Sequence, residues 1–445
     1  MRYLSLAALA AMLLSTSAFA QDDVLKGSAA FGGWQDDSPG VKRHITVDDL
    51  EPPKPEESTS NTSQPVPRPD GAMPKLPEGF TATLVAENLE GPRVLRFAPN
   101  GDLFIAMSDL GEVKIFRFAD GADQPEAHTY VEGLNQPYGI AFYPPDNPEW
   151  LYVAESDGLK RYPYKEGDLA APDGEPEAIV QGIPAEHHWT RDVAFSPDGK
   201  TLYFSVGSGS NVGLDMTMEP EPEGGLDAWI KDYPLGVAWG GEERRAAVLA
   251  FSPDGKDERY FATGLRNCSG MTVQPATGDL WCVVNERDEI GDNVPFEYAT
   301  SVKDGAFYGW PWLYNGDHSD PRWSMTPRDD LKGQVTVGDV LFQAHSAPLN
   351  IVFNDSDAWG ADWKGDAFVA MHGSWNRNTR TGYKVVRLDF DESGKPTGVY
   401  EDFMTGFVLN DNDVWARPVG VAFDKDGNLF VSDDGNGTIW KVSKQ

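Results

Sequence analysis

The chain has 445 residues, of which 70 are acidic and 37 are basic, so its formal net charge is −33. So negative a surface repels nucleic acid and anionic membranes, which excludes both as partners. The 46 Gly, 33 Pro and many aromatic residues, without long stretches of helical period, favour an all-β fold with many turns.

The first twenty residues have the pattern of an export signal. Arg2 precedes an apolar run that ends in Ala18-Phe19-Ala20, the small-x-small sequence that signal peptidase cleaves. We expect cleavage after Ala20. No later stretch approaches eighteen uninterrupted apolar residues, so no membrane insertion is predicted. The mature protein is therefore expected to be soluble and periplasmic or secreted.

Two segments of different composition follow the signal. Residues 21–50 form an N-terminal arm whose Phe31, Trp34 and Ile45 are enough apolar surface to dock on the main body. Residues 51–76 are rich in Pro, Glu, Ser and Thr, a composition typical of a linker. The catalytic domain is expected to occupy residues 77–445.

One phrase recurs in that domain: a short apolar strand that ends in Phe, a turn that often holds Asn-Gly or Asp-Gly, and a second apolar strand. Such turns accept positive φ, so each phrase predicts a hairpin. Six phrases predict a six-bladed β-propeller of four-stranded antiparallel blades, with one phrase as the inner hairpin of each blade. They lie at residues 94–106, 138–154, 191–204, 270–284, 349–370 and 418–431. A further copy at 248–255 lies too close to the next and is assigned to an outer hairpin.

Cys268 and Cys282 are the two cysteines of a chain that is expected to be exported, where disulfides are permitted. If the intervening turn is centred near Thr277, Cys282 faces about Thr272 rather than Cys268. The sequence therefore does not decide whether Cys268 and Cys282 form a disulfide. Neither cysteine belongs to a C-x-x-C-H sequence, so no covalently attached haem is encoded.

Three segments between predicted strands are dense in polar and aromatic residues, and loops at one end of a propeller channel converge. The first, residues 186–191, contains His187, His188 and Arg191. A histidine can take a proton from a substrate hydroxyl, and an arginine can stabilise a developing anion. A lone histidine is more often structural, so a catalytic role depends on what the other two segments supply.

The second segment, residues 264–311, has several carboxylates and turn carbonyls, which suit a hard cation such as Ca²⁺. Acidic loops are also common in so acidic a chain. The third, residues 344–377, together with Lys384 and Arg417, brings basic side chains from separate loops. Such groups can bind a small polyanion through charge-assisted hydrogen bonds, or simply form surface ion pairs.

An ordered set of motifs carries a family resemblance over most of the chain. They are His188-Trp-Thr-Arg191, Gly264-Leu-Arg-Asn267, Val284-Asn-Glu-Arg-Asp288, Phe307-Tyr-Gly-Trp-Pro311, His372-Gly-Ser-Trp-Asn-Arg377 and Arg417-Pro-Val-Gly-Val421. In this order they resemble the soluble glucose/sorbosone dehydrogenases that depend on pyrroloquinoline quinone (PQQ). The resemblance is strongest to the sorbosone dehydrogenase-like branch.

The resemblance implies non-covalent PQQ held with Ca²⁺ at the top of the channel. It also implies a small sugar-like aldehyde or alcohol as the substrate, and a separate soluble electron acceptor such as a cytochrome or a quinone. By position, His188 would be the catalytic base, with His187 as the fallback. Arg191, Arg266 and Asn267 match residues expected near the cofactor ring.

The resemblance also suggests how the cofactor would be held. Main-chain oxygens around Arg287 and Asp288 would hold the calcium ion, and Arg377, Lys384 and Arg417 are candidates for the cofactor carboxylates. Cys268 departs from the family, which more often has Pro there, and a thiol beside a quinone can react with it.

Two alternatives belong to other functional classes. A Ca²⁺-dependent lactonase-type propeller hydrolase would use a metal-bound water, and the converging Arg and Lys residues argue against it. A non-catalytic binding propeller would show no cofactor dependence at all.

Overall fold

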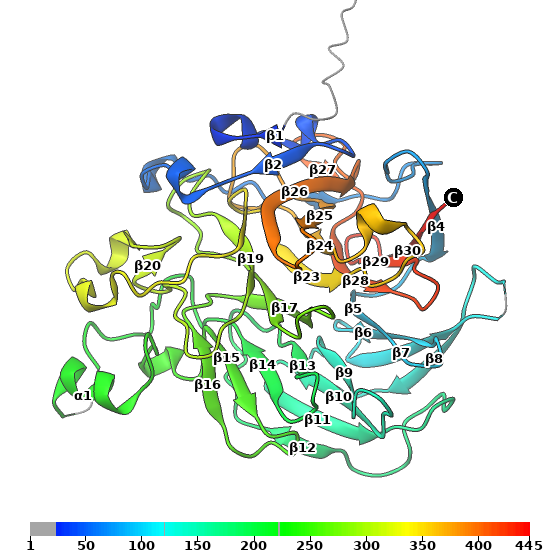
Figure 1. Cartoon of the computed structure of the whole chain (residues 1–445), viewed down its shortest axis with the longest axis horizontal. Coiled ribbons are helices and arrows are strands. Elements are labelled where there is room, and N and C mark those ends of the chain that lie inside the picture. The colour runs from blue at the N-terminus through cyan, green and yellow to red at the C-terminus, as the bar shows by residue number, and fades with distance from the viewer. Residues whose placement is uncertain (1–23, 120, 221–222) are drawn as a thin grey trace, which may run out of the picture.

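The computed structural model describes residues 24–119, 121–220 and 223–445. The expected export signal lies outside them. Six blades, each of four antiparallel strands, are arranged in a ring, with β5, β9, β13, β17, β23 and β28 around its middle (Figure 1). The N-terminal arm extends the sheet of the fifth blade to six strands. The predicted six-bladed β-propeller is therefore confirmed. Within the described residues, no helix has the length and apolar character needed to cross a membrane.

The blades follow one another in chain order. The first is β5 (Pro92–Phe97), β6 (Leu103–Met107), β7 (Glu112–Arg117) and β8 (Glu126–Val131), and the second is β9 (Ile140–Tyr143), β10 (Trp150–Glu155), β11 (Gly158–Pro163) and β12 (Glu177–Val180). The third is β13 (Val193–Phe195), β14 (Leu202–Val206), β15 (Ala247–Phe251) and β16 (Arg259–Thr263), and the fourth is β17 (Cys268–Val273), β18 (Leu280–Val284), β19 (Glu297–Ser301) and β22 (Val340–Phe342). The fifth is β23 (Pro348–Phe353), β24 (Ala367–Met371), β25 (Lys384–Phe390) and β26 (Pro396–Met404), and the sixth is β28 (Pro418–Phe423), β29 (Leu429–Asp433), β30 (Thr438–Lys444) and β4 (Phe80–Ala86).

Each recurrent phrase forms the two inner strands of its blade. Gly101, Gly199 and Gly427 have φ of +89°, +67° and +81° at the turns of three such hairpins, which is the conformation these positions require. The second strands β6, β18, β24 and β29 are buried throughout, because they lie between neighbouring blades. The extra copy at 248–255 runs from β15 into its turn with β16, as the outer-hairpin assignment predicts.

The ring closes through a strand from the other end of the domain. Strand β4 precedes the first blade in the chain, yet it pairs antiparallel with β30 as the outer strand of the sixth. Apolar side chains fill the spaces between blades, as where Trp281 of the fourth blade packs on Phe353 and Phe390 of the fifth, with ring centroids 5.8 and 5.2 Å apart. Packing between blades therefore forms the core of the molecule.

The remaining elements are short. A long insertion between β14 and β15 carries the one α-helix of the described residues, α1 (Gly225–Asp232), and it packs with the 305–335 loop around Trp229, Trp239 and Trp312. Two small ribbons are β20 (Leu313–Tyr314) with β21 (His318–Ser319), and β27 (Asp413–Val414) with β3 (Gln64–Pro65). The 3₁₀ turns are η1 (Gly27–Ala30), η2 (Trp34–Asp36), η3 (Val47–Asp49), η4 (Pro55–Glu57), η5 (Gly240–Glu242), η6 (Pro321–Trp323), η7 (Asp329–Leu331) and η8 (Ala361–Trp363).

The two cysteines form a disulfide inside the fourth blade. The expected register was one residue off: Cys282 lies opposite Met271, not Thr272. A β-bulge between Cys268 and Gly270 adds a residue to β17, and Cys268 pairs with Val284. Cys268 is therefore not a free thiol beside the channel.

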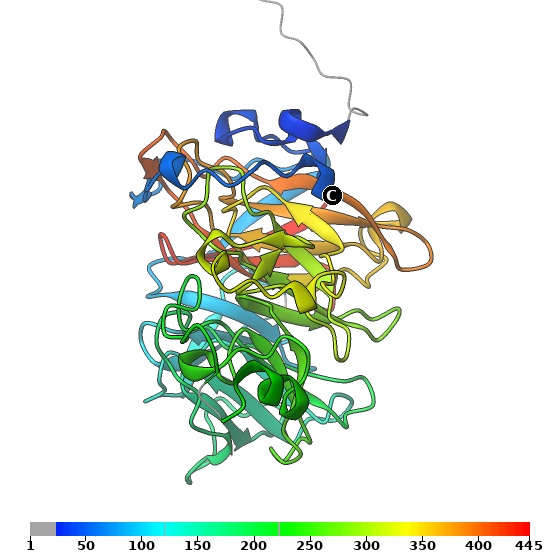
Figure 2. The same cartoon turned by 90° about the vertical axis from the view of Figure 1, so that its left-hand side faces the viewer.

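The N-terminal arm lies along the outer edge of the fifth blade (Figures 1 and 2). Strand β1 (Val24–Leu25) pairs with β2 (Lys42–His44), and β2 extends the sheet at β26. Residues 51–76, expected as a linker, also contact the propeller: the Arg380 guanidinium donates to the main-chain oxygens of Asn61 and Thr62, at 2.8 and 3.2 Å.

Two buried cations and two buried carboxylates join the arm to the blade. Lys384 Nζ lies 2.6 Å from Asp37 Oδ1 and 2.8 Å from Asp402 Oδ1. Arg43 places its guanidinium 2.9 and 2.7 Å from the same two oxygens. All four side chains are nearly or fully buried, so each charge depends on the others for compensation.

Replacing one carboxylate of this cluster should be costly. In Asp402→Asn, two buried cations share one remaining anion, so we expect the free energy of unfolding to fall by about 3–5 kcal/mol, measured by urea denaturation. The matched control is Asp198→Asn, whose pair with Lys200 is exposed and which should change stability by less than about 1 kcal/mol. Equal effects of the two changes would contradict a structural role for the cluster.

Candidate functional site

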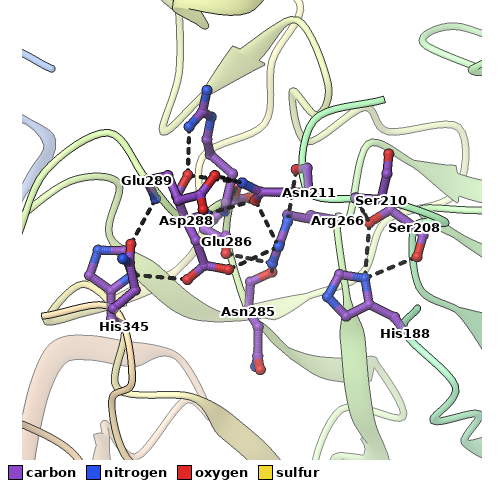
Figure 3. A network of polar contacts seen from close by, with 12 residues as sticks. His188, Ser208, Ser210, Asn211, Arg266, Asn285, Glu286, Asp288, Glu289 and His345 are labelled. Carbon is purple, nitrogen blue, oxygen red and sulfur yellow. Dashed lines mark hydrogen bonds and ion pairs between the residues drawn. The ribbon is translucent and has the colours of Figure 1, made fainter. Parts of the chain in front are cut away.

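Loops of the third, fourth and fifth blades meet at one end of the channel. Residues 186–191 lead into β13 and residues 207–211 follow β14, whereas residues 264–267 lead into β17 and residues 285–293 follow β18. Residues 343–347 lead into β23. Hydrogen bonds and ion pairs link these loops into one network (Figure 3). The first two predicted segments and the start of the third therefore lie together.

Arg266 is at the centre of this network. Its Nη1 donates to the main-chain oxygen of Glu286 at 2.6 Å, and its Nη2 donates to Asn211 Oδ1 at 2.9 Å and Asp288 Oδ2 at 3.1 Å. Nε donates to the main-chain oxygen of Asn211 at 3.1 Å. A buried guanidinium with this set of acceptors holds the loops of the third and fourth blades together.

One ring nitrogen of His188 is held by Ser208. Its Nδ1 lies 3.0 Å from the main-chain oxygen and 3.0 Å from Oγ of Ser208, and Figure 3 shows the ring turned toward these atoms. A carbonyl oxygen only accepts, so Nδ1 carries the hydrogen and Nε2 keeps its lone pair. Burial, then the positive charge of Arg266 and the nearby His187, hold the pKa of His188 well below its usual range. The ring is therefore a neutral base at physiological pH.

Asn267 lies directly beside this histidine. A Cβ on Gly207 would come within 2.4 Å of Asn267 Oδ1 and 2.7 Å of His188 Cβ, so only glycine lets the three residues approach. Asn267 Oδ1 is buried without a hydrogen-bond partner among the described residues. An orphaned polar atom beside a neutral base is what a bound polar ligand would satisfy.

Arg191 braces the histidine loop. Its guanidinium donates to the main-chain oxygens of residues 184, 188 and 190, all within the segment that carries His188. Arg245 adds a second brace, since it donates to the main-chain oxygens of Gly207 and Ser208, both at 3.0 Å. The contacts of Arg191 therefore hold the base in position.

Arg287 and Asp288 have their own partners in the loop after β18. Arg287 pairs with Asp320 through Nε and Nη2, and its Nη1 donates to the main-chain oxygen of Asp288. The Asp288 carboxylate lies 3.1 Å from Arg266 Nη2 and 3.3 Å from His345 Nδ1. Against the effect of burial, His345 and Arg266 hold the pKa of this carboxyl below its usual range.

This arrangement does not fit the expected calcium ion. The main-chain oxygen of Asp288 already accepts from Arg287 and, at 3.1 Å, from Asn211 Nδ2. No three or more His, Cys, Asp or Glu side chains in the described part of the chain are grouped to hold a metal.

A second cluster of charges involves the sixth blade. Arg417 Nη2 lies 2.9 Å from His372 Nδ1, and His372 Nε2 lies 2.8 Å from Asp434 Oδ1. Arg93 pairs with the other oxygen of Asp434 and lies 5.3 Å from the ring centre of Trp189, the neighbour of His188. The Nε atoms of Arg93 and Arg417 have no partner among the described residues. The main chain of Arg417 also donates to the Asp433 carboxylate, so the two arginines lie beside two carboxylates. What the cluster offers an anionic ligand is therefore an unused Nε donor on each arginine.

The other two candidates for cofactor carboxylates point elsewhere. Lys384 belongs to the buried cluster that holds the arm. Arg377 Nη2 donates to the main-chain oxygen of Phe31 at 2.7 Å and to Asn293 Oδ1 at 2.9 Å, while its Nη1 has no partner in the described part of the chain. Of the three basic residues, Arg417 alone belongs to the Arg93–Asp434 cluster.

The backbone is strained around the network. His187, Glu289, His345 and Ala347 have φ of +64°, +70°, +65° and +54°, a region that residues with a side chain rarely adopt. Such positions gather at functional sites, where the surrounding contacts impose the conformation. The strain supports this end of the channel as the functional site.

Several participants were not among the predicted site residues: Arg93, Asn211, Arg245, Glu286, His345 and Asp434. Arg245, Glu286 and Asp434 lie one or two residues outside a strand, a position that would have directed attention to them. Arg93 lies within β5, and Asn211 and His345 lie farther into their loops. Asn211 and Arg245 belong to the insertion after β14, and no recognised motif covers them.

Comparisons with known proteins agree on one family. The sequence profile of the TrAA12-like family matches residues 74–302 and 324–445. The chain is 25% identical over 389 residues to an uncharacterised protein of Borreliella burgdorferi, covering 83% of this chain and 90% of that one. It is also 25% identical over 418 residues to a pyrroloquinoline quinone-dependent pyranose dehydrogenase of Coprinopsis cinerea, covering 82% of this chain and 54% of that enzyme.

A solved structure shares the fold. The holo form of the PQQ domain of pyranose dehydrogenase from Coprinopsis cinerea superposes with a TM-score of 0.68 at 21% identity, covering 86% of this chain and 100% of that one. The propeller and its order of blades are therefore those of a known architecture.

Glu286 provides a test of the site through its pH dependence. Burial, opposed by Arg266, raises the pKa of this carboxyl from 4.5 to about 7. Between these pH values the folded protein retains a proton that the unfolded chain has released, so the free energy of unfolding falls as pH rises. The total loss is about 3 kcal/mol.

Glu286→Gln should remove this loss. We expect urea denaturation to show similar stability for the two proteins at about pH 5, and a variant more stable by about 3 kcal/mol at about pH 8. A parallel pH profile of variant and wild type would show that Glu286 does not titrate in this range.

Proposed function

This chain belongs to the TrAA12-like family, and from that premise we propose that it is a PQQ-dependent sugar dehydrogenase. The resemblance of its motifs to the soluble PQQ-dependent sugar dehydrogenases is confirmed by that membership and by the curated relatives. The observation that carries the function is the neutral His188, whose Nδ1 is held by Ser208 and whose Nε2 has no hydrogen-bond partner among the described residues.

The residues of the site fit a tricarboxylate quinone. Arg93 and Arg417 each offer an unused Nε donor, and Asn267 offers, beside the base, a buried amide oxygen without a partner among the described residues. When bound, PQQ supplies an oxidant that accepts hydride from the substrate carbon. The protein then has to bind the quinone, orient the substrate and remove one proton.

His188 removes that proton. The substrate hydroxyl donates to Nε2, and the proton passes to this atom as the C–H bond breaks. Ser208 keeps Nδ1 protonated throughout, so the ring becomes an imidazolium with its orientation unchanged. Arg191 and Arg245 fix the loop on which the ring depends, and they therefore act as positioning residues.

The substrate class is supported by the curated relatives, which are pyranose and sugar dehydrogenases. We propose a sugar or a sugar-derived aldehyde or alcohol, with a sorbosone-like aldehyde as one member of the class. Electrons then leave to a separate acceptor, for which a soluble cytochrome or quinone is the expected type. An exported location remains the expectation from the first twenty residues.

The proposal is tested by titrating metal-stripped protein with PQQ, with and without Ca²⁺, while dye reduction is followed against aldoses, sorbosone-like aldehydes and polyols. Saturable activity is expected. A calcium requirement is what the sequence resemblance implies, whereas saturation without calcium is what the occupied Asp288 oxygen predicts. No cofactor binding under either condition would contradict the proposal and favour a hydrolase or a binding propeller.

Arg417→Ala should weaken PQQ binding roughly tenfold to a hundredfold, because it removes a charge-assisted hydrogen bond, while turnover at saturating cofactor changes less. The readout is quenching of protein fluorescence by the quinone. The matched control is Arg161→Ala on the outer strand β11, far from the channel, which should bind as wild type does. An unaltered binding curve for Arg417→Ala would remove it from the cofactor site.

His188→Ala should lower turnover roughly 10²- to 10⁴-fold, as expected for loss of a general base, with cofactor binding nearly unchanged. His187→Ala is the companion variant, because its ring lies 4.2 Å from that of His188 and it is the alternative base. Full turnover in His188→Ala with loss in His187→Ala would transfer the role to His187.

A further inference from the structure

A pocket of about 390 Å³ adjoins the network at His187. It shares Asn211 and Asp288 with the Arg266 network, and its other walls include Ser210, Asp215, Glu289 and Trp375. The ring centroids of His187 and His188 lie 4.2 Å apart, so a ligand in this pocket lies one side chain away from the base. The established contacts of the base do not use this pocket.

Trp375 presents an open aromatic surface there. Its side chain remains 40% exposed, whereas most tryptophans of the chain are buried. An aromatic ring has a negative face that attracts the positive edge of C–H bonds. A pyranose ring has one apolar face of C–H groups and a rim of hydroxyls, so it suits a flat aromatic wall with polar groups around it.

The N-terminal segment holds this tryptophan in place. The main-chain oxygen of Trp375 accepts from Asn61 N at 2.6 Å. The next residue, Asn376, donates to Thr59 O at 3.0 Å and accepts from Glu289 N at 2.7 Å. The main chain at Trp375 is therefore tied to both the N-terminal segment and the site loop, which fixes where its exposed ring emerges.

The polar rim of the pocket is negative. Asp215 and Glu289 form no ion pair with any of the described residues, and Asp288 is neutralised by Arg266 and His345. Carboxylates accept hydrogen bonds from sugar hydroxyls and repel anionic groups. The pocket therefore suits a neutral sugar and disfavours a uronic acid.

We propose that Trp375, Asp215 and Glu289 form a subsite for a second, neutral pyranose ring linked to the ring that reacts. The inference rests on the proposed function and specifies its substrate class: the non-reducing part of a neutral oligosaccharide rather than a free monosaccharide alone. Trp375 supplies the stacking surface, and the two carboxylates exclude charged rings.

Equilibrium binding tests the subsite without turnover. Full-length protein without added PQQ is titrated by calorimetry with methyl β-cellobioside and with the corresponding disaccharide that carries a terminal glucuronate. We expect saturable binding of the neutral glycoside and at least roughly tenfold weaker binding of the anionic one. Equal affinity for the two glycosides would overturn the charge selection.

Variants then test the residues. Trp375→Ala should weaken binding of the neutral glycoside roughly threefold to tenfold, and Trp375→Phe should retain most of the affinity. Asp215→Asn should reduce the difference in affinity between the neutral and the anionic glycoside. The control Met325→Ala alters an exposed apolar side chain outside the pocket and should bind as wild type does. Unchanged binding in Trp375→Ala would overturn the subsite.

The two proposals can fail independently. Binding that depends on Trp375 in a protein that takes up no PQQ would leave the subsite standing and remove the dehydrogenase. PQQ-dependent oxidation of sugars, with unchanged glycoside binding in Trp375→Ala, would support the dehydrogenase and overturn the subsite.

Discussion

The buried guanidinium of Arg266 is the interaction on which the site depends. A charge in this position requires oxygen acceptors, and those acceptors come from the loop after β14 and the loop after β18. The two loops cannot separate without leaving the charge uncompensated. Together with burial, which has the larger effect, the charge of the same residue lowers the pKa of His188, so Arg266 both assembles the site and helps to keep its base neutral.

The fold was largely predictable because its signal is local. Five of the six inner hairpins have a positive-φ glycine in the turn between two apolar strands, a pattern that can be read over a short stretch of sequence. The turn at 144–149 is rich in proline instead. The motif around His188 predicted a base, and the structure has a neutral imidazole at this position. The disulfide was not predictable in the same way, because the bulge at Cys268 shifts the register by one residue and no turn signal marks it.

The partners of basic residues were the hardest to predict. Lys384 and Arg377 carry the same charge as Arg417 and lie in comparable motifs, yet they bind the arm. What separates them is contact with residues more than three hundred positions away, such as Asp37 and Phe31. A sequence pattern identifies the hydrogen-bond donors, but only the fold determines which acceptor lies close to each of them.

The pairing of β4 with β30 has a consequence for how the ring can form. The sixth blade takes its outer strand from a segment made before all the other blades and its inner three from the very last part of the chain. Five blades can be completed in the order of synthesis, but the closing blade has to wait until the strand at 438–444 is available. Until then β4 is an unpaired edge strand, open to association with other chains. The propeller thus acquires its closed topology in one late event, and a chaperone that shields this single edge would protect the whole molecule during biosynthesis.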